Sequence, residues 1–163
     1  MAVVVTALSD YPEFVPVVAR WNWQEWGHTD PGGNLEGWTA GLARQAGADQ
    51  IPGTLVAVAD GVPVGAVCLV GQDMPGLAAA EGLSPWIKAL YVAPAARRRG
   101  HGTLLMSRCQ AWASALGHRT LYLYTERGSG AERLYERLGW QAIGRAEYDG
   151  IDATIMSLQL DPV

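Results

Sequence analysis

The spacing of apolar positions divides this chain into helix-like and strand-like segments. Over residues 11–26 the apolar side chains of Phe14, Val18 and Trp21 recur at helical spacing, which predicts an amphipathic helix. Further helices are predicted over residues 34–46, 100–116 and 129–138. Runs rich in β-branched residues predict strands at 2–8, 54–59, 64–70, 86–92, 119–125, 140–145 and 152–159. This order favours an α+β fold with flanking helices and a mixed, mostly antiparallel central sheet of about seven strands.

Two connections stand out between these elements. The segment Asp60-Gly61-Val62-Pro63 predicts the turn of a hairpin between the second and third strands. Residues 71–84 form a predicted loop before the next strand. Loops of that length inside a compact domain are often functional, so this one is a candidate part of a site.

The segment after strand 86–92 has the composition of an anion-binding loop. Pro94 ends the strand, a basic run with two glycines follows, and a helix then begins. Unpaired backbone N–H groups and the helix dipole favour an anion at such a helix start. Gly100 and Gly102 allow close approach of the backbone to a phosphate, and the arginines at 97–99 add charged donors. The alternative is a solvated basic turn that binds nothing.

Two familiar phosphate loops do not match this segment. A Walker A loop ends in Gly-Lys-Ser/Thr, whereas this loop ends in Gly-His-Gly-Thr and has no lysine. The dinucleotide fingerprint needs a small residue three positions after Gly102, where Leu105 stands. The pattern that remains is Arg97-x-x-Gly100-x-Gly102.

A second pattern lies at residues 129–140. Ser129 and Glu132 form a capping box that starts a helix, and Gly139 is a natural stop. Between them runs Ala-x-x-Leu-Tyr-x-x-Leu-Gly-aromatic, with the tyrosine at Tyr135. In this order and spacing, the two patterns resemble the pyrophosphate loop and second signature of the GNAT superfamily of acyl-CoA-dependent N-acetyltransferases. The resemblance covers residues 54–158 and is weakest over the first fifty residues. It implies a V-shaped cleft between two splayed parallel strands.

The resemblance also implies a reaction. An N-acetyltransferase of this kind would move an acetyl group from acetyl-CoA to a primary amine by direct attack in a ternary complex. Tyr135 falls on the position of a general acid for the CoA thiolate, although spacing alone would favour a core aromatic residue. A backbone N–H near Leu90 to Val92 would stabilise the oxyanion. The residues expected to bind the cofactor are Leu90, Tyr91, Val92, Arg97, Arg98, Arg99, Gly100, His101, Gly102, Thr103 and Tyr135.

The general base is the least defined part of the predicted site. Strand 86–92 contains no carboxylate, so the base is either Glu81, just upstream, or a water relay. Glu25, Glu126, His28 and His101 are weaker candidates. The sequence also departs from the family pattern at Gly128, where many members carry an asparagine that helps to hold the pantetheine arm. That contact cannot be transferred to this chain.

The acceptor site is expected between the first two helices and the loop before strand 86–92. These segments contain Trp21, Trp23, Trp26, Trp38 and Trp86. We predict acceptor contacts for Trp26, Trp86 and Thr125, with core packing the equal alternative for the two tryptophans. Tryptophan faces attract cations, which suits an amine. A peptide N-terminus, a small amine, an aminoglycoside-like antibiotic and a lysine side chain all remain possible acceptors.

Composition narrows the class of protein. The chain has 163 residues, which suits a single acetyltransferase domain over residues 1–163. A net charge of −4 argues against a general nucleic-acid binder. Two cysteines make no disulfide framework, and neither a signal peptide, a membrane span nor a metal site is predicted. We therefore expect a cytoplasmic protein, possible as a homodimer. The alternative functions are a non-catalytic acyl-CoA-binding sensor or regulator and a structural interaction subunit.

Overall fold

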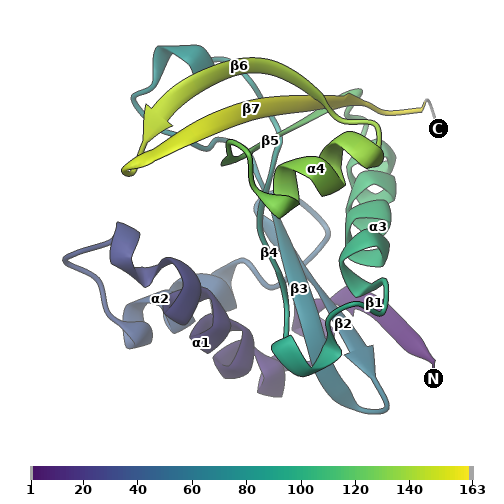
Figure 1. Cartoon of the computed structure of the whole chain (residues 1–163). Helices are drawn as coiled ribbons and strands as arrows, with labels where there is room; N and C mark the ends of the chain where they lie inside the picture. Colours follow the sequence, from purple (N-terminus) through teal and green to yellow (C-terminus); the bar gives the residue numbers. More distant parts are fainter. Residues whose placement is uncertain (1, 162–163) are drawn as a thin grey trace.

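A mixed seven-stranded sheet forms the centre of the computed structural model, which describes residues 2–161 (Figure 1). Its spatial order is β1-β2-β3-β4-β5-β7-β6, and every neighbouring pair is antiparallel except β4 and β5, which run parallel. The fold class predicted from the sequence is therefore confirmed. The strands are β1 (Val3–Ala7), β2 (Gly53–Ala59), β3 (Val62–Val70), β4 (Trp86–Val92), β5 (Thr120–Glu126), β6 (Gln141–Tyr148) and β7 (Ile151–Gln159).

Helices cover both faces of the sheet. In Figure 1, α1 and α2 lie on one side of the β2–β4 half and α3 lies on the other. The side chains of α3 and α4 enter one buried cluster, and those of α1 and α2 enter another. The helices are α1 (Val15–Trp26), α2 (Leu35–Arg44), α3 (His101–Ala115) and α4 (Gly130–Arg137).

The starts of the first two helices follow local chemistry. A 3₁₀ turn at Pro12–Phe14 precedes α1, so the segment predicted as one helix over residues 11–26 is a 3₁₀ turn followed by an α-helix. Pro16 lies in the first turn of α1, where a missing N–H costs nothing. Asn34 caps α2 by accepting a hydrogen bond from the Gly37 N–H at 2.7 Å, in agreement with the predicted helix start.

The hairpin between β2 and β3 is tighter than predicted. Its turn consists of Asp60 and Gly61 alone, with φ of 51° and 77°, which is the geometry that two-residue turns need. Val62 and Pro63 already belong to β3. The pairing register of β2 with β3 shifts between Ala57 and Val58. Val58 is opposite Pro63, which has no N–H for a ladder hydrogen bond.

The alternation of side chains along β5 separates the two faces of the sheet at the centre of the molecule. Leu121 and Leu123 enter the cluster beneath α3 and α4. Tyr122 and Tyr124 point to the opposite face, into a cluster that includes Trp86 and the loop between β3 and β4. The single strand β5 thus places leucines on the face that carries α3 and tyrosines on the face that carries α1.

Candidate functional site

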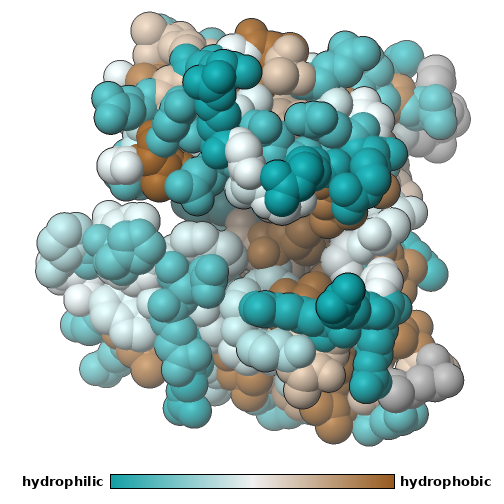
Figure 2. Space-filling view, in the orientation of Figure 1, coloured by the Kyte–Doolittle hydropathy of each residue, from teal (hydrophilic) through white to brown (hydrophobic). Residues whose placement is uncertain are grey.

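The parallel strands β4 and β5 pair only where they begin to run together. Trp86 is in register with Tyr122, and the Tyr122 N–H donates to the Pro85 carbonyl at 3.0 Å. Beyond that point the strands diverge, which leaves the β5-facing edge of β4 without a strand partner. Figure 2 shows a cleft with a hydrophobic floor across the middle of this face of the molecule. The V-shaped opening expected from the sequence is therefore present.

The chain leaves β4 and enters α3 through the basic glycine loop. A 3₁₀ turn at Pro94–Ala96 follows the strand, and Gly100, with φ of 81°, precedes the first helical residue. No side chain caps the N-terminus of α3 and no acidic residue lies in its first turn. The free N–H groups and the dipole of α3 are therefore available to an anion.

The two glycines leave room at this helix start. A Cβ on Gly100 would meet no atom within 4 Å, and one on Gly102 would meet only a Val92 methyl group at 3.8 Å. The backbone at Gly100 and Gly102 can therefore be approached closely from the side of the loop. His101 is buried in the first turn, whereas Thr103 is exposed. The open backbone N–H groups fit a pyrophosphate.

The three arginines of the loop differ in their surroundings. All are exposed, but Arg97 is tied to the strand, because its Nε donates to the Val92 carbonyl at 2.9 Å. Its guanidinium also lies 5.6 Å from the centre of the Tyr91 ring, in cation–π range. Arg98 has a φ of 65°, an uncommon conformation that turns the loop toward the helix. Arg97 therefore shapes the loop, while Arg98 and Arg99 present charge to solvent.

A bulge interrupts β4 next to the open edge. The register with β3 shifts between Ala66 and Cys68, and Ala89 on β4 adopts a φ of 57°. For alanine this conformation costs about 1–2 kcal/mol. The bulge turns Leu90 toward the α3 side, and Tyr91 stacks on Trp21 of α1 at 5.3 Å. Sequence reasoning missed Ala89, since no residue type there signals a bulge.

Tyr135 lies in α4, on the α3 side of the sheet. Its side chain is 8 % exposed and packs 6.3 Å from the Trp140 ring. Burial raises the pKa of the Tyr135 phenol to about 12. The hydroxyl therefore stays protonated at neutral pH and remains a possible proton donor.

The loop before α4 is held by its own side chains. Ser129 Oγ accepts the Glu132 N–H at 3.1 Å, as the capping box predicted. Glu132 Oε1 accepts the Gly128 N–H at 3.3 Å, and an Arg133 nitrogen donates to the Gly128 carbonyl at 2.9 Å. Thr125 Oγ1 lies 3.4 Å from Ser129 Oγ. Both backbone groups of Gly128 are thus engaged by side chains of α4.

The tryptophans predicted at the acceptor site occupy different environments. Trp86 is fully buried, and its indole N–H donates to the Leu83 carbonyl at 2.6 Å. Trp26 is partly exposed at the end of α1, with its ring 6.4 Å from that of Tyr91 and nearly perpendicular to it. Trp86 therefore packs as a core residue, and Trp26 is the tryptophan of the two that retains a surface for contact.

Glu81 lies in the loop between β3 and β4. It is exposed after a 3₁₀ turn at Ala78–Ala80 and lines a hollow of about 280 Å³. That hollow is lined by residues 72–81 of the same loop, with none from β4, β5 or α1. The 3₁₀ turn of this loop contacts β6. The buried Met74 and Ala80 of the same loop pack in one cluster with Trp86 of β4 and Tyr122 of β5.

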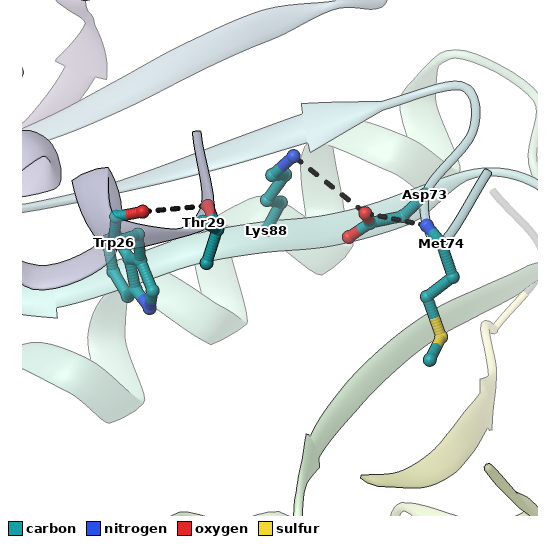
Figure 3. Close-up of polar contacts among 5 residues, drawn as sticks. All are labelled: Trp26, Thr29, Asp73, Met74 and Lys88. Carbon is teal, nitrogen blue, oxygen red and sulfur yellow. Dashed lines mark hydrogen bonds and ion pairs between the residues drawn. The ribbon is translucent and has the colours of Figure 1, made fainter. Parts of the chain in front are cut away.

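A buried carboxylate that sequence reasoning did not single out lies at the other end of this loop. Asp73 is only 5 % exposed and its Oδ1 accepts the Met74 N–H at 2.8 Å. Lys88 of β4 reaches toward the same oxygen, with its Nζ 3.8 Å away (Figure 3). Oδ2 is buried and finds no hydrogen-bond partner among residues 2–161. Burial raises the pKa of the Asp73 carboxyl, and the charge of Lys88 opposes that rise.

Two tyrosines accompany this carboxylate. Tyr124 of β5 and Tyr148 of β6 meet edge to face at 5.6 Å in the cluster beside Met74. Burial, followed by the negative charge of Asp73, raises the pKa of the Tyr124 phenol. Burial is likewise the main reason for the raised pKa of Tyr148, with smaller contributions from Asp149 and Asp73. Asp73, Lys88, Tyr124 and Tyr148 therefore form one polar and aromatic group, which we name the Asp73 cluster.

Within the described residues, no group of three or more histidine, cysteine, aspartate or glutamate side chains is arranged to hold a metal ion. Across the same part of the chain, no helix has the length and apolar character needed to cross a membrane.

Comparisons with known proteins identify a matching family and several structures of the same fold. Residues 10–140 match the model of a family described as the acetyltransferase (GNAT) family. No curated protein sequence matches the chain. Among solved structures, yncA of Salmonella typhimurium, determined with its cofactor acetyl-CoA, superposes with a TM-score of 0.74 at 21 % identity, over 99 % of this chain and 95 % of that one.

Two further structures extend the comparison. An aminoglycoside 6′-N-acetyltransferase complexed with coenzyme A gives a TM-score of 0.75 at 16 % identity, covering 100 % of this chain and 99 % of the other. The NatC complex bound to Gag peptide and CoA gives 0.72 at 18 % identity, with 99 % and 100 % covered. At such identities the likeness concerns the fold.

Proposed function

Because this chain belongs to the GNAT acetyltransferase family, we propose that it moves an acetyl group from acetyl-CoA to a primary amine by direct attack in a ternary complex. One observation carries the proposal. The uncapped N-terminus of α3, opened by Gly100 and Gly102, lies directly after the strand whose β5-facing edge has lost its partner. An anion site and a free strand edge in succession suit a cosubstrate with a pyrophosphate at one end of an amide-containing arm.

The cofactor-binding residues follow from this placement. Backbone N–H groups from Arg98 to Thr103, with Gly100 and Gly102 among them, hold the pyrophosphate, and the charges of Arg98 and Arg99 assist. The open edge of β4 over Leu90, Tyr91 and Val92 binds the amides of the pantetheine arm. Acetyl-CoA is also the ligand of the Salmonella structure, and CoA that of the aminoglycoside enzyme, which supports the choice.

Acetyl-CoA supplies an acetyl thioester whose carbon–sulfur bond breaks as the carbon–nitrogen bond forms. The Tyr135 hydroxyl gives its proton to the departing sulfur, and a proton released by the amine nitrogen restores the phenol. A pKa raised by burial suits this role, since the phenol is never lost to ionisation at neutral pH. A backbone N–H between Leu90 and Val92, just after the bulge at Ala89, donates to the oxygen that gains negative charge.

The acceptor amine must lose a proton before it attacks, because an alkyl amine with a pKa near 10.4 is mostly charged at neutral pH. We propose Glu81 or a water relay as the base. The exposed position of Glu81 favours the relay, because no residue of β4 or β5 lines the hollow beside this carboxylate. Trp26, Trp86 and Thr125 remain our proposed acceptor contacts, with Trp86 acting through packing rather than an exposed surface.

The acceptor class and the cellular setting are also proposals. One structure of this fold is named as an aminoglycoside 6′-N-acetyltransferase and another, the NatC complex, is bound to a peptide, which supports a small amine and a peptide amine alike. We propose a cytoplasmic protein with one acetyltransferase domain over residues 1–163, on the ground that Cys68 and Cys109 are free and buried. A homodimer is a further proposal.

Calorimetric titration with acetyl-CoA tests the proposal. We expect a binding free energy of about −6 to −8 kcal/mol, which corresponds to micromolar affinity, and no comparable binding of free adenosine nucleotides. A screen of primary amines for release of CoA thiol then tests transfer. Binding without thiol release for any amine would favour the acyl-CoA sensor, and absence of binding by folded protein would favour the structural interaction subunit.

A further inference from the structure

Asp73 is a buried carboxylate with half of its hydrogen-bonding capacity unused. Its side chain is 4 % exposed, Oδ1 has the Met74 N–H as its partner, and Oδ2 has none among the described residues. An ionised carboxylate can accept on both oxygens, and a buried one without partners is costly, so native structures seldom keep it without reason. A ligand with N–H donors would complete it.

The position of Asp73 points to the acceptor. Its neighbour Lys88 lies on β4 two residues past Trp86, and Tyr124 lies on β5 two residues past Tyr122, where the pairing of the two strands ends. Lys88 and Tyr124 therefore occupy matching positions on the two strands as they separate. Asp73 faces Lys88, and the adjacent Met74 packs in one cluster with Tyr124 and Trp86, so Asp73 lies at the narrow end of the opening. This is the face of Tyr122 and Tyr124, opposite to that of α3 and Tyr135.

The present neighbour of the carboxylate indicates the chemistry that it binds. Lys88 Nζ is a primary ammonium on an aliphatic chain, and it stops 3.8 Å from Oδ1, beyond hydrogen-bond distance. The lysine side chain is 53 % exposed, so it is free to swing away. Tyr124 and Tyr148 add aromatic surface, which also attracts ammonium groups. Lys88 thus stands where a similar group from a ligand would approach.

We propose that the Asp73 carboxylate binds the acceptor's ammonium group in the place now held by Lys88 Nζ beside Oδ1, that the acceptor carries a primary ammonium at the end of an aliphatic chain, and that Lys88 competes with it for the carboxylate. The proposal rests on the function proposed above. It assigns acceptor recognition to a residue between β3 and β4, and it makes Lys88 a resident competitor rather than a structural partner.

The test measures amine binding at Asp73 without turnover. The protein is labelled with ¹³C at aspartate carboxyl carbons, and the Asp73 resonance is identified by its loss in Asp73→Asn. The probe is n-butylamine, titrated at pH 7 in the presence of CoA, with n-butanol as the uncharged control. We expect the Asp73 resonance to shift saturably with n-butylamine and to stay fixed with n-butanol. A resonance that n-butylamine does not move would overturn the proposal.

The variant Lys88→Met gives the more decisive test, because opposite results are expected if Lys88 is a competing cation and if it is a structural partner. If Lys88 competes, this variant binds n-butylamine several-fold more tightly than the parent, and Asp73→Asn binds it at least tenfold more weakly. Unchanged or weaker binding in Lys88→Met would overturn the competitor role. Circular dichroism of each variant confirms folding. Calorimetry with acetyl-CoA, which depends on α3 and not on Asp73, separates failure of this proposal from failure of the proposed function.

Discussion

The two faces of the opening between β4 and β5 offer different chemical groups to a ligand. On the α3 side, the groups offered to a ligand belong to the backbone: the first turn of α3, the glycine loop and the free edge of β4. On the other side they are side chains from separate segments, with Trp26 from α1, Asp73 from a loop, Lys88 from β4 and Tyr124 from β5. The α3 side is built by a local motif, whereas the opposite side is assembled from segments that are far apart in the sequence.

This difference has a functional meaning. A backbone site binds whatever fits its N–H groups, and substitution of one exposed side chain changes it little, which suits a cosubstrate common to a whole family. A side-chain site changes with each substitution, which suits acceptors that differ between proteins. We therefore expect changes on the α3 side to act on every reaction of the enzyme, and changes on the other side to act on the choice of amine.

The largest effect is expected at Gly102. A Cβ has room there, since its nearest neighbour would be Val92 at 3.8 Å, so Gly102→Asp should fold. Its carboxylate would repel the pyrophosphate and occupy the helix N-terminus in its place. We expect loss of acetyl-CoA affinity by more than about 100-fold, or roughly 3 kcal/mol by calorimetry.

Gly144→Asp is the matched control for that variant. Gly144 lies in the outer strand β6, has no atom within 4 Å of a built Cβ, and does not have a positive φ. The control adds the same charge to the molecule and should leave acetyl-CoA affinity within about twofold. Equal losses in both variants would mean that net charge, and not the loop, governs binding.

The second effect concerns Tyr135, on the α3 side. Tyr135→Phe keeps the ring against Trp140 and removes the hydroxyl. Since general acids contribute about 10²–10⁴-fold, we expect kcat to fall roughly 100-fold while acetyl-CoA affinity stays the same. Tyr11→Phe, at a ring that stacks on Phe14, removes a hydroxyl elsewhere as the control. Unchanged turnover in Tyr135→Phe would leave this residue as a core aromatic only.

The α3 side was largely predictable from the sequence for a physical reason. Its geometry depends on neighbours along the chain, so Gly100, the arginines and the Ser129–Glu132 capping box announce themselves by residue type and spacing. The two splayed parallel strands and the opening between them followed from the resemblance that these motifs carry. The bulge at Ala89 did not, because an alanine with positive φ is imposed by the pairing of β4 with β3.

The other side was not predictable, because its residues are far apart in sequence. Asp73 lies in an irregular loop with no motif, and only the folded chain brings it to Lys88 and Tyr124. Trp86 and Trp26 could not be told apart either, since burial depends on tertiary packing and not on residue type. The carboxylate that the sequence favoured, Glu81, belongs to the same loop but faces solvent.

A smaller effect is expected at Trp26. In Trp26→Ala the partly exposed ring beside Tyr91 is lost. We expect a two- to five-fold rise in KM for the primary amine that releases thiol fastest, the worth of one exposed cation–π contact, with KM for acetyl-CoA unchanged. Trp23→Ala, on the same helix but packed against Trp38, is the control. A rise in KM for both substrates would place Trp26 on the shared floor of the cleft and weaken the division between the faces.

The smallest effect, on stability, bears most directly on why Asp73 is retained. Because burial raises its pKa in the folded protein, the folded state holds a proton over a pH range where the unfolded state, with a pKa near 3.9, has lost it. Stability contributed at this site is therefore present at low pH and is lost as pH rises through that range.

Asp73→Asn removes the buried charge and keeps an oxygen for the Met74 N–H, so it should be more stable than the parent at pH 7. For a chain of this size, about 1 kcal/mol corresponds to a rise in Tm of roughly 2–4 °C, measurable by calorimetric melting. The difference should shrink as pH falls, because the folded parent takes up a proton on Asp73 at a higher pH than the unfolded chain does. A variant less stable than the parent at pH 7 would show that Asp73 and Lys88 hold the fold together. A more stable one would show that the acceptor side keeps a carboxylate at the expense of stability, as ligand-binding residues often do.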